Sequence, residues 1–254
     1  MRLKILGSWG AQLESKRCTS FLVDDTLLLD AGGTAGALSL EEIRAIRSIV
    51  ISHSHLDHIG SLPFIGEFCL SGGCGSLDLH ALGDTIDALK THLFNGVLWP
   101  DLTCLPSADK PVFNCVKHHA RERFAFGEYE VELIPVTHTV PCAAVLLRWD
   151  AGSFLFVSDT APTEEVWEVA RAEEKLKGLL LDVSFPNRMA EQCVAWGHLS
   201  PLHVDQELEK LGRDDVPAYL YHFKPYCLDE LEREYRAITY PAVRRVTQGE
   251  VLEF

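Results

Sequence analysis

The sequence predicts an α/β fold in which two β-sheets pack face to face and helices cover their outer sides. Two observations support this prediction. The chain runs in two similar halves, each opening with a β-meander and passing to strand-helix units. No linker or low-complexity segment separates the halves, so we expect a single domain over residues 1–254.

Composition describes a globular protein with a sizeable core, because 47% of residues are hydrophobic and mean hydropathy is +0.04. No apolar run approaches the ~20 residues that span a bilayer, and the first residues reach Gly7 and Ser8 before a signal-peptide core forms. We therefore expect a cytoplasmic protein without a membrane partner. The eight cysteines include no Cys-x-x-Cys pair and are interpreted as buried or incidental thiols. Metal binding by Cys69 and Cys74 is a weaker alternative.

The formal charge of -14 bears on the kind of partner. Acidic residues outnumber basic ones 37 to 23, which argues against a long polyanion such as extended nucleic acid. A small anion remains compatible, because bound divalent ions reverse the local potential of a pocket whatever the net charge.

The first half is expected to begin with strands over 3–6, 19–23 and 26–29, which end in a glycine turn after Asp30. Ser39 is a candidate cap, followed by Glu41 and Glu42, so a helix is predicted over 39–46. Apolar runs and periodicity then predict a strand over 48–51, a helix over 62–68, a strand over 77–81 and an amphipathic helix over 84–94.

The second half repeats this plan. Strand patterns return from Phe113 and continue over 129–136, 143–149 and 153–157. A helix over 163–171 leads to a buried strand over 178–183, and Ser200-Pro201 opens another helix through Leu211. A strand over 218–222 and a helix over 228–236 complete the predicted elements.

The stretch from Ile51 to Gly60 packs His53, His55, Asp57 and His58 into six residues. In an extended segment alternate side chains share a side, so His53, His55 and Asp57 can converge while His58 projects elsewhere. Imidazole nitrogen and carboxylate oxygen suit zinc, with iron, manganese or cobalt as alternatives. A histidine-rich surface loop is the ordinary alternative, but apolar runs on both sides argue against it.

Three further candidates stand at predicted strand ends, where α/β folds place binding and catalytic groups: His138, Asp159 and His222. Each alone has an ordinary explanation as a structural or capping residue. Together with the histidine motif they would complete two metal sites that keep open positions for water and substrate.

This order of motifs resembles the metallo-β-lactamase superfamily of binuclear hydrolases, and the match runs from Met1 to Phe254. The resemblance implies a four-layer αββα sandwich. Three further segments are similar to signatures of class II cyclic-nucleotide phosphodiesterases: residues 85–100, Ser184-Phe185-Pro186-Asn187 and Gly197-His198-Leu199-Ser200-Pro201. They are more specific than the histidine motif, which the whole superfamily shares.

The resemblance implies two divalent ions, with zinc favoured and manganese or iron as alternatives. By position, one ion would be held by His53, His55 and His138 and the other by Asp57, His58 and His222. Asp159 would bridge the ions, and Asp30 would orient a liganding histidine.

The activity implied is hydrolysis of a 3′,5′-cyclic nucleotide, cyclic AMP or cyclic GMP, to the 5′-monophosphate by a metal-bridging hydroxide that Asp57 and Asp159 orient. His198 would bind a phosphate oxygen or protonate the leaving 3′ oxygen, with Asp182 orienting it. Asn95 and Trp99 are candidate walls for sugar and base. Departures around Ser184, where the class commonly has Glu-Cys-Ser-Phe, and at Ser200 bear on substrate preference.

Three rival functions use the same fold. A transfer-RNA 3′-processing nuclease of the ribonuclease Z type is disfavoured by the acidic charge and the lack of a glycine- and lysine-rich arm. A thioester or lactone hydrolase stays open, whereas a redox di-iron module is disfavoured by His55, where such relatives tend to carry Glu. A scaffold with a decayed site would lack ligands that this chain keeps.

A homodimer is expected only from the general frequency of dimers.

Overall fold

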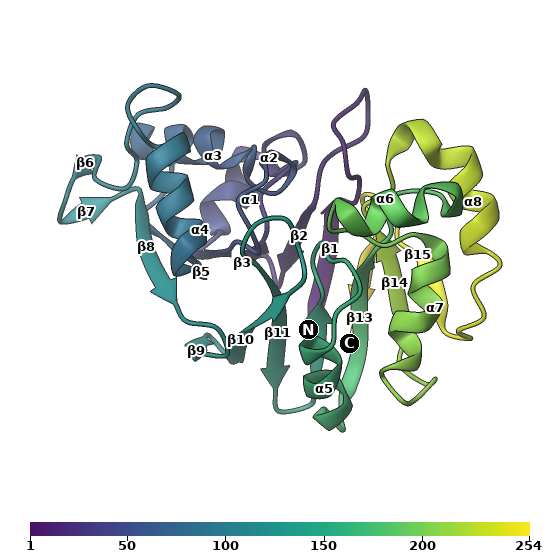
Figure 1. Ribbon diagram of the computed structural model, residues 1–254. Helices are drawn as coiled ribbons and strands as arrows, with labels where there is room; N and C mark the ends of the chain where they lie inside the picture. Colours follow the sequence, from purple (N-terminus) through teal and green to yellow (C-terminus); the bar gives the residue numbers. More distant parts are fainter.

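Two seven-stranded β-sheets form the centre of the computed structural model, which describes residues 1–254 (Figure 1). The strands of the first sheet are ordered β16 (Val251–Glu253), β1 (Arg2–Gly7), β2 (Ser20–Val23), β3 (Leu27–Leu29), β4 (Ser48–Val50), β5 (Leu77–Leu82) and β8 (Phe113–His118). Those of the second are ordered β15 (Val243–Arg245), β14 (Ala218–Tyr221), β13 (Leu176–Asp182), β12 (Gly152–Phe156), β11 (Cys142–Trp149), β10 (Tyr129–Val136) and β9 (Arg123–Phe126).

Both sheets change from antiparallel to parallel pairing, which confirms the two similar halves that the sequence predicts. In the first sheet β1, β2 and β3 pair antiparallel, and β3, β4, β5 and β8 then pair parallel. In the second, β9 to β12 pair antiparallel before the parallel run of β12, β13, β14 and β15. Parallel strands end at the same edge of a sheet, so the loops after β4, β13 and β14 can meet.

Alternation along the strands divides the apolar residues into three cores. In β2, Phe21 and Val23 face the second sheet, whereas Leu22 faces the outer helices. In β13, Leu180 lies between the sheets, whereas Leu179 and Leu181 belong to the opposite outer core. Successive side chains of a strand point to opposite faces, so two sheets buried on both faces produce four layers.

Helices cover the two outer faces, as the fold prediction requires. On the first sheet lie α1 (Leu40–Ala45), α2 (Leu56–Ile59), α3 (Leu62–Phe68) and α4 (Gly83–Ala88), which continues as the π-type turn η3 (Leu89–Leu93). On the second lie α5 (Glu165–Ala172), α7 (Pro201–Glu209) and α8 (Leu228–Tyr235), with α6 (Ala190–Ala195) nearby (Figure 1). Each of these helices is too short or too polar to cross a membrane.

Several short elements were not predicted. They are the 3-10 turns η1 (Thr34–Gly36), η4 (Asn187–Met189) and η5 (Pro225–Cys227), the hairpin β6 (Pro106–Ser107) and β7 (Lys110–Pro111), β9, α6, β15 and β16. The edge strands β15 and β16 have three residues each and carry charged side chains, so they lack a clear apolar alternation.

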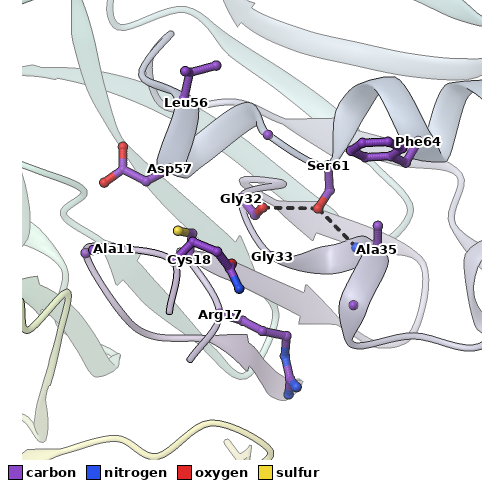
Figure 2. Close-up of a pocket in the computed structure, with 14 residues that line it drawn as sticks. Ala11, Arg17, Cys18, Gly32, Gly33, Ala35, Leu56, Asp57, Ser61 and Phe64 are labelled. Carbon is purple, nitrogen blue, oxygen red and sulfur yellow. Dashed lines mark hydrogen bonds between the residues drawn. The ribbon is translucent and has the colours of Figure 1, made fainter. Parts of the chain in front are cut away.

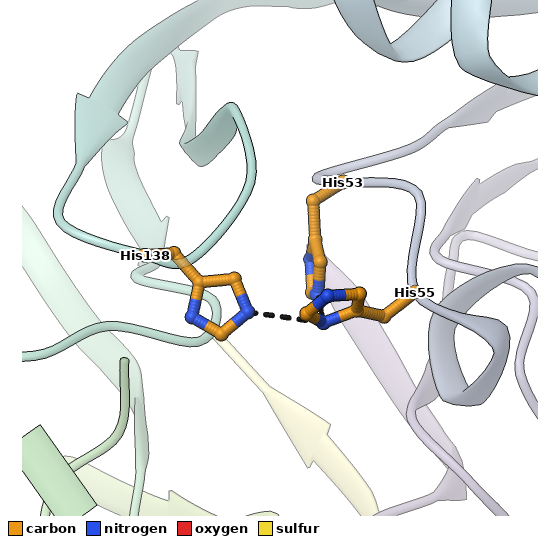
Figure 3. A group of neighbouring side chains, drawn as sticks. All are labelled: His53, His55 and His138. Carbon is orange, nitrogen blue, oxygen red and sulfur yellow. Dashed lines mark hydrogen bonds between the residues drawn. The ribbon is translucent and has the colours of Figure 1, made fainter. Parts of the chain in front are cut away.

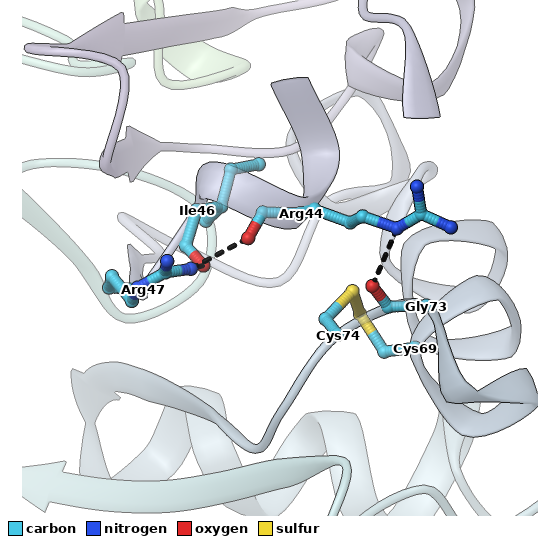
Figure 4. Close-up of a disulfide and its surroundings, with 6 residues drawn as sticks. All are labelled: Arg44, Ile46, Arg47, Cys69, Gly73 and Cys74. Atoms are coloured by element: carbon cyan, nitrogen blue, oxygen red, sulfur yellow. Dashed lines mark hydrogen bonds between the residues drawn. A yellow bond between two sulfur atoms is a disulfide. The ribbon is translucent and has the colours of Figure 1, made fainter. Parts of the chain in front are cut away.

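The interpretation of the cysteines as unpaired thiols is wrong for Cys69 and Cys74, which form a disulfide (Figure 4). The turn η2 (Cys69–Gly73) brings them together, because Gly72 takes a φ of 84° that reverses the chain after α3. Arg44 Nε donates to the Gly73 carbonyl at 3.0 Å and ties this turn to α1. The disulfide also excludes these sulfurs from the metal-binding alternative.

The buried contact between α5 and α7 yields a stability prediction. Trp167 is fully buried, and its Nε1 donates to the buried carboxylate of Glu207 at 2.7 Å. Trp167→Phe removes this donor and leaves a small void, so we expect a loss of about 1–3 kcal/mol in the free energy of unfolding, measured by urea denaturation at fixed metal content. The half-exposed Trp196 provides a control, and Trp196→Phe should change stability far less. Equal effects of the two substitutions would contradict this account.

Candidate metal centre

The candidate ligands lie at the strand ends of one edge of the sandwich. His53 follows β4, and His58 lies in α2 just beyond it. In the second sheet, His138 follows β10, Asp159 follows β12 and His222 follows β14 directly. The two halves of the chain therefore contribute to one site, as expected from the sequence.

Three histidines form the first group of possible ligands (Figure 3). The Nδ1 atom of His55 lies 3.1 Å from both His53 Nε2 and His138 Nε2. Figure 3 shows the three rings turned toward a common point, with His138 approaching from the opposite side to His53 and His55. Three imidazole nitrogens converging in this way leave a further position open, which is the arrangement typical of catalytic metal sites.

A second group of possible ligands consists of Asp57, His58 and His222. His222 Nε2 lies 3.2 Å from Asp57 Oδ2. Asp159 lies beside this group, with Oδ2 at 3.2 Å from the Nε2 atoms of both His58 and His222. The same oxygen is 4.0 Å from His53 Nε2, so Asp159 stands between the two groups.

In three of the candidate histidines, the Nδ1 atom contacts a polar group outside the two ligand groups. Asp30 Oδ2 lies 2.6 Å from His58 Nδ1, and Asp30 also accepts from the Ser52 amide and hydroxyl. His138 Nδ1 lies 2.7 Å from the Gly197 carbonyl, and His222 Nδ1 lies 2.7 Å from Ser184 Oγ. Contacts of this kind fix ring orientation and direct the other nitrogen toward a metal.

Backbone conformation at the site is unusual. Asp30, Ser158 and His222, each at the end of a buried strand, have φ values of 54°, 66° and 70°. Non-glycine residues seldom adopt this left-handed conformation, and it tends to concentrate at functional sites. Gly10 fits against His222, since an added Cβ would lie 2.8 Å from the ring and 2.5 Å from the backbone oxygen of His222.

The pKa values of all three histidines in the first group are lowered, which favours binding of a cation. Burial lowers the pKa of His53 well below its usual value, and the nearby His58 lowers it further. Burial likewise lowers the pKa of His55 and of His138. These imidazoles are therefore neutral at physiological pH, with lone pairs available as ligands.

The second group is more strongly charged. Burial opposes charge on Asp159, but His222 and His58 outweigh it and hold the pKa of that carboxyl well below its usual range. For His58 the carboxylates of Asp159 and Asp30 likewise overcome burial and raise the pKa well above 6.5. The pKa of His222 is also raised, mainly by Asp159. These two imidazoles therefore bind protons more tightly than a free histidine does.

The donor set fits divalent metal ions. Within each of the two groups the donor atoms lie within 4.8 Å of one another, and most of these side chains are buried. Buried carboxylates and neutral imidazoles with oriented rings are costly to assemble unless a cation binds between them. The chemistry of the donors, nitrogen and oxygen without a thiolate, matches zinc, manganese or iron.

His198 and Asp182 form a buried pair beside these ligands. His198 Nδ1 lies 2.8 Å from Asp182 Oδ2, so Asp182 orients this ring. No hydrogen bond involves His198 Nε2, which leaves this atom available to another molecule. The rings of His198 and His222 stack at 5.2 Å, so His198 stands at the side of the second group.

Asn95 and Trp99 lie outside the groups of candidate metal ligands. The Asn95 side chain is exposed and organises its own loop, accepting from the Val97 and Leu98 amides at 2.9 Å. Trp99 packs edge-on against Phe64, with ring centroids 5.5 Å apart. Phe64 lines a cavity that Asp57 also borders, whereas neither Asn95 nor Trp99 does. Their predicted contacts with a substrate stay predictions.

Some residues of the site were missed by sequence reasoning. The Ser184 hydroxyl joins Asp182 and His222, with distances of 2.7 Å to each side chain. Lys224 is buried two residues after His222, and its Nζ lies 3.8 Å from Asp57 Oδ2. A lysine two residues after a histidine at a predicted strand end is visible in the sequence, whereas the contacts of Ser184 depend on the tertiary fold.

Comparisons with known proteins identify the family and the fold. Residues 26–223 match the family described as the beta-lactamase superfamily domain. The metallo-beta-lactamase fold protein YhfI from Bacillus subtilis has a TM-score of 0.79 and 15% identity, with 99% of each chain covered. This likeness confirms the predicted four-layer sandwich.

Curated relatives are cyclic-nucleotide phosphodiesterases by name. A probable 3′,5′-cyclic-nucleotide phosphodiesterase from Yersinia pestis is 27% identical over 205 residues, covering 72% of this chain and 58% of that protein. The 3′,5′-cyclic-nucleotide phosphodiesterase 1 of Saccharomyces cerevisiae is 28% identical over 200 residues, covering 68% of this chain and 52% of that protein. The chain thus spans little more than half the length of these relatives.

Metal binding should release protons. The pKa values of His58 and His222 are raised by neighbouring carboxylates, Asp159 above all, so these imidazoles bind protons more tightly than a free histidine, and a metal competes with those protons for the lone pairs. Affinity should therefore fall as the pH is lowered. Calorimetric titration with zinc at pH 7, in two buffers of different ionisation enthalpy, should report release of protons as zinc binds.

The variant Asp30→Asn tests whether the raised pKa of His58 is a source of the released protons. It removes the carboxylate that raises the His58 pKa and orients its ring, so fewer protons should be released and zinc should bind about 10–100-fold more weakly. Zinc binding that is independent of pH and of buffer would contradict the assignment of these imidazoles as ligands.

Proposed function

The chain belongs to the beta-lactamase superfamily, and from this premise we propose that it is a metal-dependent phosphodiesterase that opens 3′,5′-cyclic nucleotides to 5′-monophosphates. The observation that carries the proposal is the convergence of two ligand groups, joined by Asp159, beside the His198–Asp182 pair. The names of the curated relatives support the same reaction.

We assign the metal ligands as the sequence predicts. His53, His55 and His138 would hold one divalent ion, and Asp57, His58 and His222 the other, with Asp159 shared. Zinc is the favoured ion, and manganese or iron would suit the same donors. Such ions, when bound, lower the pKa of water and stabilise negative charge on phosphate oxygens.

His198 is proposed as the general acid. Opening the ring requires a water molecule to lose a proton to solvent as its oxygen bonds to phosphorus, while the bond from phosphorus to the 3′ oxygen breaks and the 3′ oxygen gains a proton. Asp182 holds His198 through Nδ1, so a protonated His198 can donate from Nε2 to that oxygen. The Asp182 carboxylate also fixes the orientation of this ring, since the two side chains are buried together.

The substrate is proposed to be small. The protein has a net charge of -14, which disfavours a long polyanion, whereas a cyclic nucleotide presents a single phosphodiester charge to the centre. A transfer-RNA substrate would require a basic surface, and this chain is acidic overall.

Hydrolysis of cyclic nucleotides by the zinc- or manganese-loaded protein is the direct test. We expect turnover of cyclic AMP or cyclic GMP that falls at least about a thousandfold in His55→Ala, because one ligand group loses a donor. His119 is exposed and outside the centre, so His119→Ala is the matched control and should retain activity. Cleavage of bis(p-nitrophenyl) phosphate alone would reject the cyclic-nucleotide assignment, and metal-loaded protein inactive on both would reject the phosphodiesterase.

The role of His198 can be tested through the leaving group. A ribose 3′ alkoxide needs a proton to leave, whereas p-nitrophenolate does not. We therefore expect His198→Gln to lower kcat about 100-fold or more for a cyclic nucleotide but less than about tenfold for bis(p-nitrophenyl) phosphate. Metal content should be unchanged. Equal losses on both substrates would indicate that His198 binds the phosphate and does not act as an acid.

A further inference from the structure

A cavity of about 620 Å³ borders the candidate metal centre on the side of Asp57 (Figure 2). It lies between the loop after β1, the turn after β3 and the helices α2 and α3. Figure 2 shows Asp57 and Leu56 on one side and Ser61, Phe64 and Ala35 on the other. The backbone at Gly32 and Gly33 lies between them. Its volume falls within the roughly 300–1,000 Å³ of pockets that bind small molecules.

The wall of this cavity is tied to the metal centre. The amide of His222 donates to the Ser8 carbonyl at 2.8 Å, and the Gly10 amide donates to the Phe223 carbonyl at 3.3 Å. Lys224 Nζ donates to the Gly10 carbonyl at 2.5 Å while lying 3.8 Å from Asp57. A group bound against this loop would therefore have a fixed position relative to the phosphodiester at the centre.

Part of the cavity lining is apolar. Leu56 and Phe64 are 72% and 55% exposed, and both line the cavity. Trp99 packs edge-on against Phe64 and holds its ring in place. A planar heterocycle can stack on such a ring, and a stacked base typically gains roughly 1–3 kcal/mol.

Arg17 is one of the polar side chains that line the cavity. It and Asp57 are the only charged side chains that line the cavity, and they lie apart in Figure 2. Arg17 Nε donates to the Leu6 carbonyl at 2.7 Å, which anchors the side chain. Neither of its terminal nitrogens has a hydrogen bond or an ion pair. Their donors are available to a ligand with neighbouring acceptors.

We propose that this cavity binds the nucleoside of the substrate, with Leu56 and Phe64 against the base and Arg17 donating to the edge of the base. The proposal rests on the proposed function, since the phosphodiester must lie at the metal centre. Guanine offers N7 and O6 as neighbouring acceptors to a guanidinium, whereas adenine carries an amino donor at this edge. Cyclic GMP is therefore the preferred substrate.

Gly36 allows the cavity to be filled without straining the backbone. It lines the cavity, its φ is not positive, and an added Cβ would meet only Arg17 Cδ at 3.6 Å. Gly83 is a matched control outside the site, where the nearest atom to an added Cβ is Lys117 Cδ at 3.9 Å. The pair Gly36→Leu and Gly83→Leu thus compares the same substitution inside and outside the cavity.

The first measurement compares a substrate that has a nucleoside with one that has none. In Gly36→Leu we expect the ratio of kcat/KM for cyclic GMP to kcat/KM for methyl p-nitrophenyl phosphate to fall at least about tenfold, equivalent to about 1.4 kcal/mol. In Gly83→Leu the ratio should match that of the unmodified protein. Arg17→Lys keeps the charge but loses the planar fork, so it should reduce the preference for cyclic GMP over cyclic AMP.

The second measurement does not depend on turnover. Calorimetry should show that guanosine 5′-monophosphate binds the zinc-loaded protein more tightly than ribose 5-phosphate, and that Gly36→Leu removes this difference. If the protein cleaves cyclic nucleotides while Gly36→Leu changes neither ratio nor binding, the cavity assignment is overturned and the proposed function stands. If no diester is cleaved but Gly36→Leu still abolishes the binding difference, the proposed function fails and the nucleoside site stands.

Discussion

The carboxylate of Asp159 is the interaction on which the site depends. It is buried, it comes from the second half of the chain, and its Oδ2 lies 3.2 Å from His58 in the first half and 3.2 Å from His222 in the second. Burying an isolated carboxylate is costly, so it must be paired with cationic or metal partners. The two sheets must therefore meet at a fixed distance, and the central core between them sets that distance.

The left-handed residues show how the chain meets this requirement. Asp30, Ser158 and His222 each follow a buried strand and interrupt its extended backbone. Regular extended backbone would instead continue the direction of the strand. Strain of roughly 1–3 kcal/mol at each such residue is tolerated because the strands on either side are firmly packed.

Much of the fold and the ligand set could be predicted because both depend on local patterns. Strands ending in His138, Asp159 and His222 are visible as apolar runs followed by a polar residue, and four ligands lie within six residues of one another. The disulfide between Cys69 and Cys74 was missed because it depends on the backbone turn at Gly72. The roles of Ser184 and Lys224 were missed because their partners lie in distant segments of the chain.

Divalent ions bound at the centre would attract an anionic substrate even though the protein as a whole is negatively charged. Without metals, carboxylates with lowered pKa values, Asp57, Asp159 and Asp182, are balanced by protons on His58 and His222 and by the ammonium group of Lys224. Exchanging the two imidazole protons for two divalent ions would add two positive charges to a buried region, where screening by water and salt is weak. The local potential would then favour a phosphodiester even though the whole protein carries a charge of -14. Selection of a small diester over a polyanion follows from the same contrast, because a long polyanion would also be repelled by the net negative charge of the protein.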